Sequence, residues 1–184
     1  PYTYRHEAVY VDGGMTAYDP TDVLDGIEDK SSLVVNIFDF FYRKVRAATL
    51  DLADGGRLCY RVSGKGSPLI LIPPVGGDTS FWARQVPALS ARFQVITLDN
   101  RGIGRSSALP PGATTQTMAA DVLALMDHLK LDRAVLVGCA LGGLIALQCA
   151  LAAPERVAGL SVVSAYRQAD TTILETTAHW RTLA

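Results

Sequence analysis

A glycine-framed turn between an apolar run and a helix-forming run is the stretch of this sequence best suited to chemistry. Residues 134–137 read Ala-Val-Leu-Val, residues 138–143 read Gly-Cys-Ala-Leu-Gly-Gly, and a second apolar run follows up to Pro154. A strand, a sharp turn and a helix in this order are the setting of the G-x-S-x-G turn, in which a serine hydroxyl attacks a carbonyl carbon. Position 140, where that serine is expected, is alanine.

The residue types around position 140 fit such a turn. Gly138 and Gly142 provide the lack of bulk that a sharply bent backbone requires. The helix that follows supplies unpaired N–H groups and the positive end of its dipole. The same two glycines also form a G-x-x-x-G pattern, which in an apolar stretch indicates paired membrane helices. Gln148 in the second half of the run favours the alternative, a short buried strand followed by a buried helix.

The surrounding sequence predicts the elements that hold this turn. The expected strands are 49–52, 58–62, 69–72, 93–98, 134–137 and 157–163, and the expected helices are 78–92, 115–130 and 141–153. The first two strands form an antiparallel hairpin around the Asp-Gly-Gly turn at 54–56. From residue 69 onward strands and helices alternate with short connections, which predicts a parallel sheet.

Three signals in order resemble the α/β-hydrolase superfamily over about residues 47–165. They are the glycine-rich turn at 73–77, the pattern Asp99-x-Arg101-Gly102-x-Gly104-x-Ser106, and the glycine frame around Ala140. The resemblance implies an α/β fold, the α/β-hydrolase fold, with a mostly parallel sheet and helices on both faces, incomplete in this chain. It also implies hydrolysis of a carboxylic ester, thioester or lactone through an acyl-enzyme, without a metal or other cofactor.

The resemblance further assigns roles to single residues. Ala140 marks the nucleophile position, and the N–H groups of Val75 and Leu141 are the expected oxyanion-hole donors. Loops around the expected pocket carry Pro74, Gly76, Asp99 and Arg101. Members of the family usually have His-Gly where this chain has two prolines at 73–74, so the loop shape is expected to differ while the donors remain.

Two departures from the family pattern affect the expected activity. Ala140 has no hydroxyl, so this chain as written is expected to be inactive. The family's acid and histidine come later in the sequence than this chain extends, and His179 is not assigned that role. Either a working serine has been replaced, which the intact glycine frame favours, or the protein is a natural pseudoenzyme that serves in binding or assembly.

The sequence divides into three regions. Residues 1–46 are an expected N-terminal extension whose helix at 31–45 repeats apolar residues every four positions and either packs on its own domain or forms a homo-oligomer. Residues 47–165 are the N-terminal part of the core, and 166–184 begin a cap or lid. We expect the remaining core, continuous or as a separate fragment, to cover the sheet edge and supply the missing acid and histidine. A permuted arrangement, with Met15 near the histidine position, is a further reading.

Composition excludes several classes of partner. With a formal net charge of −1 in 184 residues, neither nucleic acid nor an anionic membrane is expected, which leaves a small-molecule or acyl substrate. No secretory signal is visible, so the expected location is cytoplasmic, and the 3 cysteines are expected to be reduced. His128 at a helix end, Cys139 before the turn's apex and Trp82 are interpreted as structural residues.

Overall fold

The computed structural model describes residues 47–165, which belong to a compact unit spanning Val45–Ala184. The predictions for residues 1–46, including the helix at 31–45 and the alternative role of Met15, lie outside the described residues. The same holds for the expected lid at 166–184 and for His179.

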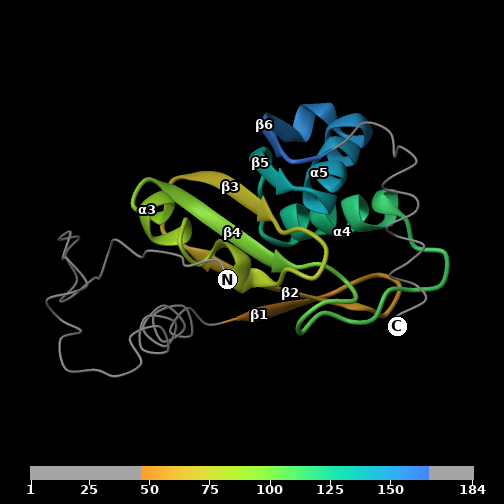
Figure 1. The fold of residues 1–184 in the computed structure, drawn as a ribbon. Helices are drawn as coiled ribbons and strands as arrows, with labels where there is room; N and C mark the ends of the chain where they lie inside the picture. Colours follow the sequence, from red (N-terminus) through yellow and green to blue (C-terminus); the bar gives the residue numbers. More distant parts are fainter. Residues whose placement is uncertain (1–46, 166–184) are drawn as a thin grey trace, which may run out of the picture. The chain divides into compact units, whose positions relative to one another are not determined.

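Within the described residues, six strands form one sheet in the order β1-β2-β4-β3-β5-β6 (Figure 1). The strands are β1 (Ala48–Asp51), β2 (Arg57–Ser63), β3 (Ser67–Ile72), β4 (Phe93–Asp99), β5 (Ala134–Cys139) and β6 (Val157–Val163). Parallel pairing joins β4 to β3, β3 to β5 and β5 to β6, whereas β2 runs antiparallel to both β1 and β4. The predicted hairpin and the predicted mostly parallel sheet are therefore confirmed.

Side chains alternate between the two faces of the sheet along each strand, so both faces carry apolar residues. Helices cover both of these faces. One face packs against α4 (Thr115–His128) and α5 (Leu141–Ala152) and forms the main apolar core. The strands contribute to this core Leu58, Tyr60, Ile70, Ile72, Ile96, Leu98 and Leu136. The other face carries Leu69, Leu71 and Val95, and the short helix α3 (Val86–Ser90) packs there against β4 (Figure 1).

The structure corrects the prediction of one helix over 78–92. A 3-10 helix, η1 (Thr79–Trp82), and the separate helix α3 occupy this range. Pro87 lies in the first turn of α3, where its missing N–H costs nothing, but the same residue cannot continue a helix that comes from η1. The helix at 115 begins where expected, because Thr114 and Thr117 form a reciprocal capping box.

The strand β6 forms one edge of the sheet within the described residues, and its apolar side chains are only partly covered. Leu160, Val162 and Val163 are 40%, 39% and 46% exposed. An apolar edge strand is a surface that proteins usually cover or pair. Among residues 47–165, no helix has the length and apolar character needed to cross a bilayer.

Candidate active site

The turn at residues 138–142 joins β5 to α5 and places Ala140 at its tip. Strand passes into helix through this single residue, which has φ 48° and ψ −113°. Residues with a side chain rarely adopt such a conformation, which costs about 1–3 kcal/mol. The Ala140 N–H donates to the carbonyl oxygen of Val163 at 2.8 Å, and the Ala140 carbonyl accepts from the N–H of Gly143 at 2.9 Å. The expected strand, turn and helix are present.

Close backbone approaches explain the two glycines of the frame. A Cβ on Gly138 would lie 2.1 Å from the carbonyl oxygen of Gly142. A Cβ on Gly142 would lie 2.2 Å from the carbonyl oxygen of Ile72 and 2.7 Å from that of Pro73. Because backbone atoms cannot move aside as a flexible side chain can, both positions require glycine. The second close approach also shows that the first turn of α5 lies directly against the point where β3 ends.

Loop 73–78, between β3 and η1, carries the other expected oxyanion donor. Its residues 74–77 form a turn closed by the Gly77 N–H and the Pro74 carbonyl at 3.1 Å, with Gly76 at φ +73° in the position where a type II turn requires glycine. Val75 is 60% exposed. Among the described residues, neither the Val75 N–H nor the Leu141 N–H makes a hydrogen bond. Both groups remain available as donors, and their pairing in an oxyanion hole stays a prediction.

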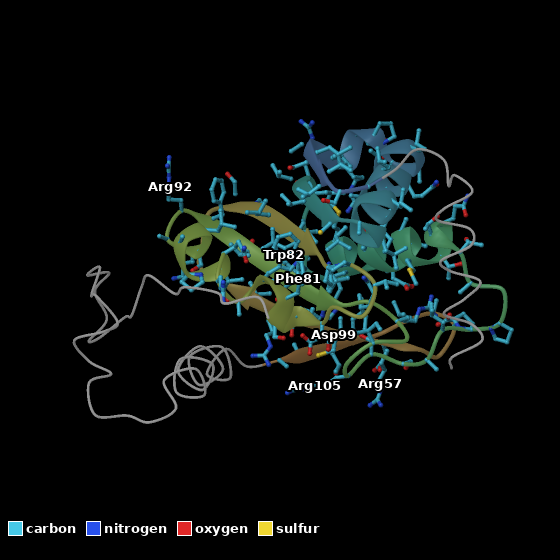
Figure 2. All side chains as sticks on the ribbon, in the orientation of Figure 1. Arg57, Phe81, Trp82, Arg92, Asp99 and Arg105 are labelled. Atoms are coloured by element: carbon cyan, nitrogen blue, oxygen red, sulfur yellow. The ribbon has the colours of Figure 1, made fainter. Side chains whose placement is uncertain are left out.

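The loop that follows β4 is organised by Asp99, a buried residue at the carboxyl end of that strand. One carboxylate oxygen of Asp99 accepts from the Thr79 N–H at 2.6 Å, and the other accepts from the Arg105 N–H at 3.0 Å (Figure 2). The Ser106 hydroxyl donates to the Asp99 carbonyl at 2.6 Å and accepts from the Cys59 N–H at 2.8 Å. These contacts tie η1, the loop after β4 and strand β2 together.

Arg101 joins three elements through a buried ion pair with Asp121 and a second ion pair with the exposed Asp54. Its Nε and Nη2 donate to the two carboxylate oxygens of Asp121 on α4 at 2.7 and 2.6 Å, and its Nη1 donates to Asp54 in the β1–β2 turn. The hydrogen bond from Arg101 holds the pKa of Asp54 below its usual value. Burial raises the pKa of Asp121, although Arg101 acts in the opposite direction. Arg101 and Asp99 thus make structural contacts, while their place beside a substrate pocket stays a prediction.

Other reactive side chains in the described part of the chain have packing roles. His128, the last residue of α4, places Nε2 3.0 Å from the Tyr60 hydroxyl and packs edge-on against that ring. Burial raises the pKa of the Cys149 thiol to about 12, which keeps it neutral. Trp82 is buried edge-on against Phe81, with ring centroids 5.0 Å apart (Figure 2).

The cysteines form no disulfide, and no metal centre is present in the described residues. Cys59 and Cys149 are buried, and Cys139 is half-buried at the end of β5. Within residues 47–165, no three His, Cys, Asp or Glu side chains are arranged to hold an ion. His128 is the one histidine in this range, and its hydrogen bond with Tyr60 gives it a structural role, so no catalytic histidine is identified among the described residues.

Sequence reasoning missed two residues near the site. Asn100 is 3% exposed, and its Nδ2 donates to the carbonyl oxygen of Pro73 at 3.2 Å. Its position directly after a buried strand, beside Asp99, was an available signal, because ligand sites gather at the carboxyl ends of parallel strands. Asp121 is the partner of Arg101, and its signal was a charged residue three positions after Met118, on the apolar side of α4.

Comparisons with known proteins agree with this geometry. A family model described as the alpha/beta hydrolase fold matches residues 67–183. "Putative carbamate hydrolase RutD" from Azorhizobium caulinodans is 41% identical over 114 residues, which cover 61% of this chain and 43% of that protein. The matched segment therefore spans less than half of this relative's length.

Solved structures give the same result. A hydrolase from Pseudomonas aeruginosa PA01 superposes with a TM-score of 0.68 and 31% identity, covering 75% of this chain and 53% of that one. The enol-lactonase from Burkholderia xenovorans LB400 gives a TM-score of 0.58 and 36% identity over 61% of this chain and 45% of its own. The described residues form part of the shared fold, and the chain belongs to the α/β-hydrolase fold family.

Proposed function

We propose that this protein derives from a serine-type hydrolase that cleaves a carboxylic ester, thioester or lactone through an acyl-enzyme, with Ala140 at the nucleophile position. The observation that carries the proposal is the strained backbone of Ala140, at φ 48° and ψ −113° on a turn between β5 and α5. Strain of this kind persists where the surrounding structure enforces it, and it is concentrated at functional sites. This strained conformation serves no chemical purpose at an alanine, whereas at a serine it would expose the attacking hydroxyl.

Three further features support acyl transfer. The N–H groups of Leu141 and Val75 lie on segments that approach each other closely at Gly142 and Ile72, and neither group makes a hydrogen bond among the described residues. The names of two similar proteins indicate hydrolysis at an acyl carbon: one is an enol-lactonase, and the RutD relative is called a carbamate hydrolase. Carbamate and lactone hydrolysis share the attack on an acyl carbon and the oxyanion that follows. In this proposal, polypeptide outside residues 47–165 supplies the acid and the histidine.

The test is Ala140→Ser in the full-length protein, assayed on small esters, thioesters, lactones and a carbamate. We expect kcat/KM to rise by roughly 10⁴-fold or more for at least one class, since removal of a serine nucleophile from a working triad costs at least that much. Cys139→Ser is the matched control, because it adds a hydroxyl one residue before the tip and should give no gain. An Ala140→Ser protein no better than its parent contradicts the proposal.

The second candidate is a binding or assembly protein on the same fold, and the missing hydroxyl of Ala140 favours it. A natural pseudoenzyme would show no gain with Ala140→Ser and would still bind an acyl ligand. Equilibrium binding of the same substrate panel to the parent protein separates the candidates. Binding together with an inactive Ala140→Ser protein indicates the pseudoenzyme.

A further inference from the structure

Loop 73–78 makes few backbone hydrogen bonds with the rest of the described structure. Pro73 and Pro74 have no N–H to donate, and the turn closed by Gly77 is internal to the loop. Among the described residues, no backbone-to-backbone hydrogen bond ties residues 73–78 to β4. Besides the close approach of Gly142 to Pro73, the position of the loop relative to β4 therefore depends on contacts with side chains from other segments.

Two consecutive residues at the end of β4 hold the two ends of this loop. Asn100 donates from Nδ2 to the Pro73 carbonyl at 3.2 Å, at the beginning of the loop. Asp99 accepts from the Thr79 N–H at 2.6 Å, just after its end. Both side chains are buried, at 3% and 2% exposure, so each bond is shielded from water.

The peptide that Asn100 holds also contacts the start of α5. The Pro73 carbonyl oxygen lies 2.7 Å from the position that a Cβ on Gly142 would take. One carbonyl group is thus fixed between the Asn100 amide and the backbone of the helix that begins with Leu141. Val75 follows Pro73 by two residues and Leu141 directly precedes Gly142, so a shift of Pro73 is expected to move one N–H group relative to the other.

We propose that Asn100 and Asp99 are positioning residues that set the geometry of the oxyanion hole by holding loop 73–78 at its two ends. This inference rests on the proposed function for its catalytic consequence, although the loop contacts themselves do not. Asp99 is itself fixed through its second oxygen by the Arg105 N–H at 3.0 Å. Asn100 is the sharper probe, since its Nδ2 bond can be removed with little change of size.

The main variant is Asn100→Leu in the full-length Ala140 protein, read by amide hydrogen exchange. We expect the Gly77 and Thr79 amides to exchange roughly tenfold faster, as the loss of one buried hydrogen bond should allow, while β5 amides stay unchanged. Gln94→Met, at the opposite end of β4, is the matched control and should leave the loop unaffected. An unchanged loop in Asn100→Leu, or faster exchange throughout the core, overturns the positioning role.

The second readout uses the Ala140→Ser background. There, Asn100→Leu should lower kcat by about 10- to 100-fold with KM within threefold, somewhat less than the outright loss of one oxyanion donor. If Ala140→Ser alone is inactive, the proposed function fails while the exchange data still decide whether the loop is held. Faster exchange of the loop amides together with an unchanged kcat would show that the loop does not set the geometry of the oxyanion hole, and this result overturns the inference.

Folding of the variant does not limit the test. Asn100→Ala is a smaller change with the same expected exchange pattern. In the parent protein, the side-chain NH₂ protons of Asn100 should exchange slowly, because they are buried and one donates to Pro73. Fast exchange of those protons in the parent contradicts the contact on which the inference depends.

Discussion

The turn at 138–142 and the loop after β4 are fixed in opposite ways. In the turn, two glycines allow backbone segments to approach closely, since a Cβ on Gly138 or Gly142 would lie within about 2.2 Å of a carbonyl oxygen. In the loop after β4, side chains make the connections, with Asp99 bound to two backbone N–H groups and Arg101 bound to Asp121. Close backbone packing is the main constraint in the turn, and side-chain hydrogen bonds are the main constraint in the loop after β4.

This difference predicts how each region responds to substitution. Where two backbone segments are in close contact, neither can move aside to make room for an added side-chain atom, so any such atom forces the turn to change its conformation. Hydrogen-bonded connections weaken in steps, because water or a neighbouring group can replace part of each bond. Substitutions in the turn should therefore be severe and those in the loop graded.

The largest effect is expected from Gly142→Ala. The new methyl would meet the carbonyl oxygens of Ile72 and Pro73, and we expect the free energy of unfolding to fall by more than about 3 kcal/mol. Chemical denaturation of the full-length protein measures this. Gly159→Ala on β6 is the control, since its Cβ would meet only Val135 side-chain atoms at 3.6–3.7 Å. Equal losses for the two variants would remove the steric account of the turn.

Arg101→Met should have the next largest effect. Removing the guanidinium leaves Asp121 buried and unpaired, which costs about 3–5 kcal/mol in comparable sites. The double variant Arg101→Met with Asp121→Leu should recover part of that loss, because no buried charge remains. Thermal and denaturant unfolding of the parent, the single variants Arg101→Met and Asp121→Leu, and the double variant gives the coupling energy. Additive losses would show that the pair is not coupled as its geometry implies.

The smallest effect concerns Asp54 and pH. Its hydrogen bond from Arg101 lowers the folded-state pKa, so the ionised carboxylate stabilises the fold above its unfolded pKa of about 3.9. That contribution is lost as the pH falls through the folded pKa. Stability curves of the parent and Asp54→Asn should differ above pH 4 and converge toward more acidic pH. Curves that stay parallel down to the acid limit would contradict the assignment to Asp54.

The sequence predicted the sterically fixed region better than the hydrogen-bonded one. Gly138, Gly142 and the change from strand to helix are visible in the sequence, because glycine spacing and hydrophobic periodicity are local properties. The contacts of Asn100 with Pro73 and of Arg101 with Asp121 join residues 27 and 20 positions apart, and no local pattern pairs them. Pro87 was likewise visible, but its role in beginning a second helix was not recognised.

The hydrogen bond from the Ala140 N–H to the Val163 carbonyl makes the corner at Ala140 depend on a segment that is synthesised later. Residue 163 leaves the ribosome after residue 140, and it must pair with β5 before this bond can form. A nascent chain that ends before β6 would hold the apolar strand β5 but not the finished corner. The corner at Ala140 is therefore completed only when β6 is in place, because the last residue of that strand accepts the hydrogen bond from the Ala140 N–H.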